Sequence, residues 1–393
     1  MGNSIDIFPE PTAMGAESWK RSCRLVERVD GSESEKQLWW EYPSNVPQAT
    51  QKNCDSYLLA VLLPAMKQGA DIHVHGSVCS ELLANMTELQ RVWVKWCPEV
   101  YQEVKIEVDE VRDEGEPVAG AVVTFSGGVD GQFTTYRHTK GLARDKRISI
   151  SAGVLVHGFD IPLEDHDGIA GAAERARVAL ADLELNLILV RTNITEVSLV
   201  NWEHYCGTAL ASVFSGMADF AGMALIASGD AYDRLVVPWG SHPITDPLLS
   251  SKRMQVIHDG AGYSRFEKIK VLSAWEVGVR NLRVCWAGEL HDRNCGNCEK
   301  CVRTRLDFLL AGEPDPTCFD TPLGKKSLAS VVLRSEAERL DWKFFYDKII
   351  RTGIGKDMLP EIEKVLKRPS VRWGSILPAN TRRRLIAKRF LGK

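Results

Sequence analysis

The stretch Ala121-Val122-Val123-Thr124-Phe125-Ser126-Gly127-Gly128-Val129-Asp130-Gly131 decides how the chain folds. Its apolar and β-branched first half predicts a short buried strand. Ser126-Gly127-Gly128 predicts a tight turn, and residues 131–136 begin a helix. Unpaired N–H groups and the positive end of the helix dipole attract an anion at such a turn. The sequence therefore predicts a phosphate site, to which Ser126 adds a hydroxyl donor.

Asp130 limits this prediction, because a carboxylate repels phosphate. It fits either as a helix N-cap or as a ligand of the Mg²⁺ that accompanies a nucleotide. An ordinary glycine turn without a ligand is the alternative. The stretch is neither a Walker A loop nor a GxGxxG fingerprint, because no Gly-Lys-Ser/Thr follows and the glycine spacing differs.

The length of 393 residues favours two or three domains, each able to bury a core. The net charge of −3 carries no general nucleic-acid signature, and 44% hydrophobic residues are typical of a soluble globular chain. Residues 1–6 lack the charged and apolar regions of a signal peptide. The longest apolar stretch, residues 207–229, fits a buried helix running into a strand better than a membrane span. We therefore expect a cytoplasmic protein without a membrane partner.

Strands and helices alternate after residue 118. Strands are expected at residues 121–125, 148–157, 185–191 and 223–227, and helices at residues 167–183 and 207–220. Such alternation implies right-handed crossovers and an α/β fold, with a parallel sheet that helices cover on both faces. In such a sheet the ligand lies beyond the carboxyl ends of the strands.

Candidate ligand contacts stand where these strands end. They are Ser126 to Gly131, His157-Gly158-Phe159-Asp160, Thr192-Asn193 and Ser228-Gly229-Asp230. Asp160 either caps a helix or holds ribose, substrate or a metal. His242 and Asp246 lie in a proline-containing loop and are two further substrate candidates. In the alternative, Asp246 satisfies backbone N–H groups and His242 packs on Trp239.

Four regions are expected along the chain. Residues 1–115 form an α/β accessory domain with a small sheet of its own, residues 116–280 the nucleotide-binding domain, residues 281–315 a zinc-binding segment and residues 316–393 a helical extension. In the first region, residues 23–29 and 37–42 are expected to pair as strands across a polar turn. In the last, helices are expected at residues 327–352 and 362–366.

The last region ends in a basic tail. From Lys364 onward the chain has ten Lys or Arg residues and no acid. Such a tail can reach RNA, DNA or an acidic protein. A solvated amphipathic helix at residues 381–391 is the alternative.

Four of the ten cysteines, Cys285, Cys295, Cys298 and Cys301, form a Cys-x9-Cys-x2-Cys-x2-Cys pattern. Four thiolates at this spacing can reach one tetrahedral Zn²⁺, and the turn at Gly296 directs backbone N–H groups toward sulfur. A closed four-cysteine site leaves no open position for water, which favours a structural role. An Fe–S cluster is the rival for the metal. Four unrelated core cysteines are the alternative to any site.

The glycine stretch resembles the SGGxDS signature of the PP-loop ATP pyrophosphatases, which hydrolyse ATP between the α and β phosphates to adenylate a substrate. One position differs: the final Ser is Gly131 here, so a hydroxyl donor is missing while the backbone N–H remains. The PP-loop followed by the cysteine pattern is similar, over residues 118–312, to the 7-cyano-7-deazaguanine synthase branch, which serves queuosine biosynthesis.

This resemblance implies an adenine nucleotide alpha hydrolase-like (HUP/PP-loop) fold that uses ATP and Mg²⁺. It implies catalytic roles for Ser126 and Asp130, backbone contacts to adenine from residues 155–158, and closure over the nucleotide by residues 225–233. The expected ATP-binding residues are Ser126, Gly127, Gly128, Val129, Asp130, Gly131, Val156, His157, Gly158, Gly229 and Asp230. The glycine loop has no lysine, so cationic help must come from elsewhere; Arg137, Lys140 and Arg144 are near in sequence.

The function implied is that of an ATP-dependent C–N ligase. Enzymes of this branch activate a carboxylate such as 7-carboxy-7-deazaguanine, release pyrophosphate, and let an amine attack the acyl-adenylate. Relatives with extra domains occur in bacterial anti-phage systems, where a protein amine can be the acceptor. A tRNA-modifying PP-loop enzyme that holds RNA with the basic tail, and a nucleotide-binding scaffold without turnover, suggested by Gly131, are the alternatives. A homodimer is a further expectation.

Overall fold

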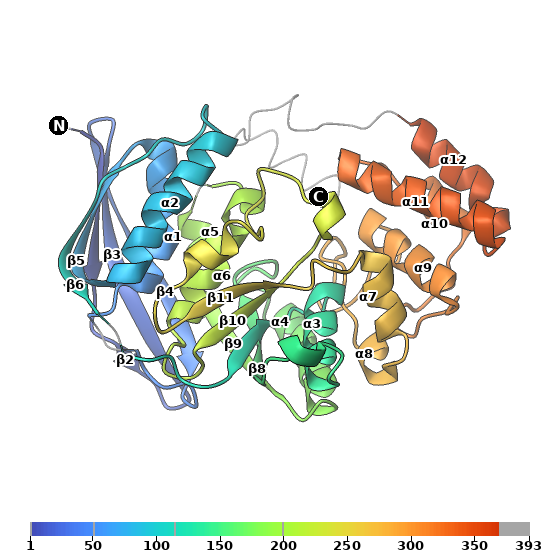
Figure 1. Cartoon of the computed structure of the whole chain (residues 1–393), viewed down its shortest axis with the longest axis horizontal. Helices are drawn as coiled ribbons and strands as arrows, with labels where there is room; N and C mark the ends of the chain where they lie inside the picture. The colour runs from blue at the N-terminus through green and yellow to red at the C-terminus, as the bar shows by residue number, and fades with distance from the viewer. Residues whose placement is uncertain (1, 50–51, 114, 199, 369–393) are drawn as a thin grey trace. The chain divides into compact units, whose positions relative to one another are not determined.

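An 11-stranded sheet is the largest element of the computed structural model (Figure 1). The structure describes residues 2–49, 52–113, 115–198 and 200–368, which divide into two units. Unit 1 is drawn from residues 1–126, 134–165 and 180–262 and holds every strand among the described residues. Unit 2 is drawn from residues 127–133, 166–179 and 263–393. The strands are β1 (Ser4–Pro9), β2 (Ala13–Met14), β3 (Ser18–Val29), β4 (Ser32–Pro43), β5 (Asp71–Cys79), β6 (Ile106–Arg112), β7 (Ala121–Thr124), β8 (Ile150–His157), β9 (Asn186–Thr192), β10 (Met223–Ala227) and β11 (Gln255–Asp259).

The sheet is mainly parallel. Its strand order is β11-β10-β7-β8-β9-β4-β3-β1-β5-β6, and β2 pairs with β3. The five strands β7 to β11 are parallel to one another, as are β1, β5 and β6, whereas β4 is antiparallel to both of its neighbours. The predicted α/β class with a parallel sheet after residue 118 is therefore confirmed. Strand β11 was not predicted, because it holds only two apolar residues and follows a proline-containing loop.

The expectation of a separate N-terminal sheet is wrong, because β4 joins the N-terminal strands to the rest of the sheet. Trp40 and Glu41 of β4 pair with Thr192 and Arg191 of β9. The hydroxyl of Thr192 also donates to the carbonyl oxygen of Trp39 (2.7 Å). This pairing joins residues about 150 positions apart, which local periodicity cannot reveal. The predicted domain limits at residues 115, 280 and 315 stay predictions.

The N-terminal hairpin has a shorter turn than expected. Asp30 and Gly31 both have positive φ (52° and 76°), as a two-residue hairpin turn requires, and Val29 pairs with Ser32. The strands therefore extend to the turn on both sides, and the polar residues after Gly31 belong to β4. Their side chains are largely exposed, so polarity here marks a solvated strand rather than a loop.

Helices cover the sheet of unit 1. They are α1 (Asp55–Gln68), α2 (Ser80–Trp96), α5 (Ile194–Val197) and α6 (Trp202–Ser215), while α3 (Val129–Thr139) and α4 (His166–Ala181) contribute to both units. Helices α1 and α2 pack on β5, and α1 also packs on α6, so these helices lie together (Figure 1). Helix α1 is buried along nearly its whole length, because it lies within this helix layer. One apolar core runs from β1 to β11.

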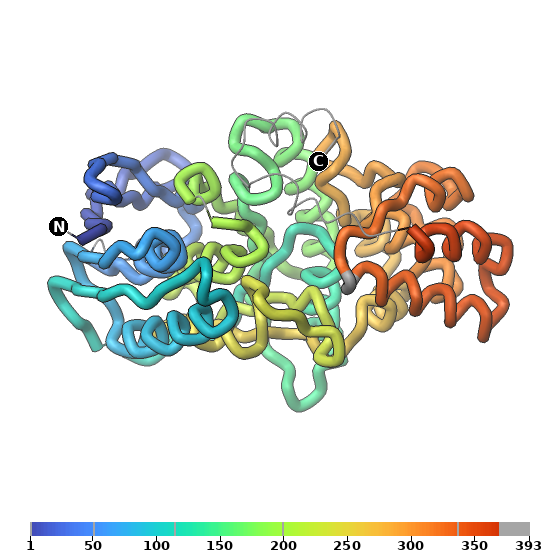
Figure 2. Tube along the Cα trace, turned by 90° about the horizontal axis from the view of Figure 1, so that it is seen from above, coloured from blue at the N-terminus to red at the C-terminus, as the bar shows by residue number. Residues whose placement is uncertain are grey.

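Unit 2 is helical in its C-terminal part. It contains α7 (Arg265–Leu272), α8 (Glu276–Arg280), α9 (Glu299–Ala311), α10 (Lys325–Ala329), α11 (Glu336–Thr352) and α12 (Leu359–Lys367). Helices α11 and α12 lie side by side (Figures 1 and 2) and share a core with α9, built around Leu306, Trp342 and Phe345. The single helix expected at residues 327–352 is divided into α10 and α11. Most of the basic tail, residues 369–393, lies outside the described residues, and none of the described helices is both long and apolar enough to span a membrane.

Candidate functional site

The strand order reverses between β7 and β10. Along the chain, β8 and β9 add on one side of β7, whereas β10 and β11 add on the other. The ends of β7 and β10 meet, because the N–H of Ala227 donates to Oγ1 of Thr124 (3.2 Å). In open α/β sheets, ligands bind beyond the carboxyl ends of strands at such a reversal. The glycine turn follows β7 directly, so it begins at the place that this rule selects.

The glycine turn has the left-handed residue that its sequence predicts. Gly127 has φ +83°, an angle that L side chains rarely adopt. Its carbonyl oxygen accepts the N–H of Arg283 (2.8 Å), and a Cβ placed on Gly127 would lie 3.4 Å from Cβ of Arg283. Helix α3 begins at Val129, two residues before the expected start. Ser126 is exposed and Gly128 half-buried, whereas Gly127, Val129 and Gly131 are buried.

Asp130, in the first turn of α3, is part of an ion pair. Its Oδ1 lies 2.8 Å from Nζ of Lys268, and its Oδ2 lies 3.8 Å from Nη1 of Arg265. The side chain of Lys268 is only 1% exposed, so the carboxylate offsets part of the cost of burying an ammonium group. A Mg²⁺ ligand role for Asp130 therefore requires the metal to compete with Lys268.

The cations near the glycine turn come from α7, and sequence reasoning missed them. Ser264 and Glu267 form a capping box that starts α7 and fixes the helix carrying Arg265 and Lys268. The Ser-x-x-Glu pattern signals this helix start, but nothing in the sequence indicates that the helix faces Asp130. Arg137, one of the basic residues near in sequence, instead pairs with Asp259 of β11 (3.2 Å).

A buried charge cluster continues from Arg265. Burial raises the pKa of Asp307 to about 7, although Nε of Arg265 lies 3.8 Å from its Oδ2. Burial, together with the like charges of Arg265 and Arg303, lowers the pKa of Lys300 to about 8. The Lys300 ammonium lies 3.3 Å from the centroid of the Trp286 ring. Arg303 in turn pairs with Glu299 (3.3 Å) and Asp341 (2.5 Å), so the cations of this cluster are matched by carboxylates.

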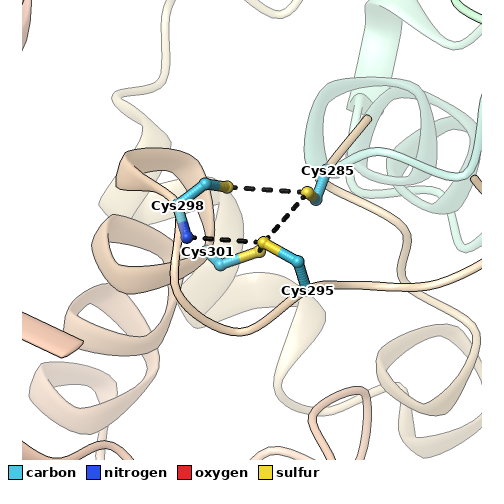
Figure 3. A group of neighbouring side chains, drawn as sticks. All are labelled: Cys285, Cys295, Cys298 and Cys301. Atoms are coloured by element: carbon cyan, nitrogen blue, oxygen red, sulfur yellow. Dashed lines mark hydrogen bonds between the residues drawn. The ribbon is translucent and has the colours of Figure 1, made fainter. Parts of the chain in front are cut away.

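The four cysteines of the predicted metal site converge, as Figure 3 shows. Sγ of Cys285 lies 3.4 Å from Sγ of Cys295 and 3.5 Å from Sγ of Cys298, and Sγ of Cys295 lies 3.8 Å from Sγ of Cys301. Sulfurs bound tetrahedrally to one Zn²⁺ at about 2.3 Å are about 3.8 Å apart. The spacing therefore fits a single ion, whereas a multinuclear iron–sulfur cluster would need a wider separation.

The local backbone prepares these sulfurs for a cation. Gly296 has φ +75°, which turns the chain between Cys295 and Cys298, and the N–H of Cys298 points at Sγ of Cys295 (3.4 Å). Hydrogen bonds with Cys295, Cys298 and Cys301 lower the pKa of Cys285, whereas the same proximity raises the pKa of Cys298 and Cys301. Several thiolates are therefore unstable together without a positive ion, which is what a metal supplies.

The predicted adenine and closure residues lie at the carboxyl ends of β8 and β10. Val156 and His157 are buried, and Nε2 of His157 lies 2.8 Å from the carbonyl oxygen of Pro162. Gly158 has φ +100° and is pressed against the backbone of β9. Gly229 is exposed with open space around it, and Asp230 is half-buried.

Two of the three predicted substrate residues, His242 and Asp246, are buried. Asp246 is 0% exposed; it accepts hydrogen bonds from Ser241 (2.7 Å) and from the backbone of His242 (3.1 Å), and lies 2.7 Å from Nδ1 of His258. The His242 ring packs edge-on against Trp96 rather than Trp239. Asp246 therefore has the role given above as the alternative, whereas His242 packs on a different tryptophan from the one expected. Asp160 is half-buried after β8, and a substrate role for these residues stays a prediction.

Comparisons of the chain with protein-family models, with curated proteins and with solved structures found no match.

Proposed function

We propose that this chain is an ATP-dependent adenylating ligase of the PP-loop type, acting at the glycine turn after β7. The observation that carries the proposal is the strand-order reversal between β7 and β10, with a left-handed glycine turn and a helix start directly after β7. Strand reversal, glycine turn and helix dipole favour the same ligand class, a nucleotide phosphate.

In this proposal Ser126 and the backbone N–H groups of residues 127–131 bind the phosphates of ATP. Lys268 and Arg265 offset the charge of the departing pyrophosphate, the role for which the glycine loop itself offers no lysine. Asp130 orients these two cations, and in the presence of Mg²⁺ it can turn to the metal. Val156, His157 and Gly158 contact adenine, and Gly229 and Asp230 close over the nucleotide.

The reaction proposed has two steps. A carboxylate oxygen of a 7-carboxy-7-deazaguanine-type substrate attacks the α phosphorus, and pyrophosphate leaves. An amine then attacks the acyl carbon, loses a proton and displaces AMP. Zn²⁺ held by Cys285, Cys295, Cys298 and Cys301 has a structural role, because four sulfurs leave no position for a reacting ligand.

The test is pyrophosphate release from ATP with and without 7-carboxy-7-deazaguanine and ammonia. We expect substrate-dependent release, reduced about tenfold or more by Ser126→Ala and by Lys268→Met, since each removes a charge or donor that acts on phosphate. Arg177→Ala, on the exposed side of α4, is the matched control and should have no effect. Absence of both ATP binding and pyrophosphate release from the unaltered chain would reject the proposal.

A nucleotide-binding scaffold without turnover is the second candidate, favoured by two observations. Asp130 is engaged by Lys268, and the signature serine that would follow is Gly131. This candidate predicts ATP binding without pyrophosphate release. Release that appears only in Gly131→Ser would favour it over the ligase.

A protein or RNA acceptor held by the basic tail concerns mainly residues 369–393, outside the described part. A role in anti-phage defence, an RNA substrate and a homodimer remain proposals of lower rank, because no contact in the described residues bears on them.

A further inference from the structure

The carbonyl of Gly127 is held by a segment with no regular structure of its own. Among the described residues, no helix or strand lies between Arg280, where α8 ends, and Glu299, where α9 begins. Yet Arg283, inside this segment, donates the N–H that Gly127 accepts (2.8 Å) and packs its Cβ against the turn. The position of the glycine turn thus depends on whatever holds residues 282–284.

Asn294 holds these residues through its side-chain amide. Its Oδ1 accepts the N–H of Val284 (2.8 Å), and its Nδ2 donates to the carbonyl oxygens of Leu282 (2.9 Å) and Cys318 (3.0 Å). The side chain therefore brackets Arg283 on both sides, and both of its polar atoms are used. Only an amide of this length combines an acceptor with two donors in this way.

Asn294 is also attached to the metal centre. It directly precedes Cys295, whose sulfur lies 3.4 Å from that of Cys285, one residue beyond Val284. The guanidinium of Arg283 donates to the carbonyl oxygen of His291 (3.2 Å), inside the same loop. A metal across the four sulfurs would fix both ends of this loop and with them the amide of Asn294.

We propose that Asn294 is a positioning residue for the glycine turn: it transmits the rigidity of the four-cysteine centre through residues 282–284 to Gly127. One consequence of this proposal, that Asn294 and the metal set the affinity for ATP, rests on the proposed nucleotide function. The hydrogen-bonded connection itself stands without it.

The experiment compares the full metal-loaded chain with Asn294→Ala, using three measurements: metal content, amide hydrogen exchange of the peptide covering residues 126–133, and the Kd for ATP. We expect one metal per chain to be retained, exchange in the turn to become faster, and ATP to bind about tenfold more weakly, since a half-buried amide that makes three hydrogen bonds is lost. Asn297→Ala is the matched control: it lies in the same loop, is exposed, and its side chain donates to the carbonyl oxygen of Cys295 (3.4 Å) and accepts from Ser327 (3.1 Å), neither of which lies in residues 282–284. It should leave all three measurements unchanged.

Arg283→Pro provides a second variant, because it removes the donor to Gly127 while Asn294 and the four cysteines stay in the chain; it also removes the hydrogen bond from Arg283 to His291. It should also speed exchange in the turn, and it decides the outcome if Asn294→Ala does not fold. Wild-type exchange in the turn of metal-loaded Asn294→Ala or Arg283→Pro would overturn the proposal. Faster exchange in a protein that binds no ATP would support the positioning role while rejecting the nucleotide function. Unchanged exchange in the turn of these variants, together with normal ATP binding, would reject the positioning role while supporting the nucleotide function.

Discussion

Asp130 and Lys268 are 138 positions apart in sequence, yet their charged atoms lie 2.8 Å apart. The lysine is almost wholly buried, while a quarter of the carboxylate side chain is exposed. A buried ammonium group needs a compensating charge, and the carboxylate of Asp130 supplies it for Lys268. The same pair places a cation beside the first turn of α3, where the sequence shows none.

We expect Lys268→Met to destabilise the chain by about 2 kcal/mol, below the cost of breaking a fully buried pair, because Asp130 is partly hydrated. Combining Lys268→Met with Asp130→Asn should recover part of the loss, since the unpaired carboxylate is then gone. Urea unfolding of the three variants measures both effects. Strictly additive losses would show that the two charges do not interact.

Asp6 gives the stability of unit 1 a pH dependence of defined sign. Burial alone would raise the pKa of its carboxyl, but hydrogen bonds with His75 (2.8 Å) and Arg28 (2.6 Å) outweigh it, and the pKa is lowered in the folded state. Such a group adds stability above its unfolded pKa of about 3.9, and this contribution is lost as pH falls through the folded value.

We therefore expect Asp6→Asn to lower stability at pH 7 and to flatten the decline of stability below about pH 4. Urea unfolding between pH 3 and pH 7 gives the profile, with the exposed Glu35→Gln as control. If the free energy of unfolding of Asp6→Asn declines with falling pH as steeply as that of the unaltered protein, His75 and Arg28 are not the partners that stabilise the Asp6 carboxylate.

At the scale of elements, α3 is held to β11 by one carboxylate. Asp259 accepts hydrogen bonds from Thr134 (2.9 Å) and His138 (3.2 Å) and pairs with Arg137 (3.2 Å). The N–H of Ile148 donates to Nδ1 of His138, which leaves the Nε2 proton directed at Asp259. Burial would raise the pKa of Asp259, but these partners lower it, so the carboxylate is charged in the folded state.

We expect Asp259→Ala to cost about 3 kcal/mol, because two buried polar groups of α3, Thr134 and His138, and the half-buried Arg137 lose their acceptor together. The exposed Asp233→Ala is the control and should cost little. Urea unfolding measures both. A cost of Asp259→Ala no larger than that of the control would mean that α3 is held by its apolar contacts alone.

The elements themselves were the part best predicted from sequence. Strand β10 has its predicted limits, and β7, β8, β9 and α4 lie within two residues of theirs, because apolar periodicity is a local signal. Strand β11 was not predicted, because its five residues show no apolar periodicity. The four-cysteine site was likewise predictable, since its ligands lie within 17 consecutive residues and their spacing restricts the geometry.

At the scale of the whole molecule, the continuous sheet links the N-terminal strands to those that follow the glycine turn. Trp40 pairs with Thr192, and Asn193 Nδ2 donates to the carbonyl oxygen of Gln37 (2.8 Å). Residues from both stretches share one apolar core, in which Tyr205 of α6 donates to the carbonyl oxygen of Ala60 of α1.

We therefore expect the fragment of residues 116–393 not to fold by itself, because removing residues 1–115 exposes the edge of β9 and takes away more than half of the buried residues of this core. Expression of the fragment, followed by circular dichroism and urea unfolding, tests this. A soluble fragment with a cooperative unfolding transition would instead support the accessory domain predicted from sequence.

By itself, the sequence determined the features that neighbouring residues produce: the strand, glycine turn and helix at residues 121–139, the alternation that makes the chain α/β, and the cluster of four cysteines. Only the tertiary structure decided the order of the strands, the joining of β4 to β9, and the approach of α7 and Arg283 to the glycine turn. The reason is that local periodicity and spacing record how each residue relates to its neighbours in sequence. Long-range partners such as Lys268 and Asp130 are chosen by packing and by the need to compensate buried charge, which appear only once the chain is folded.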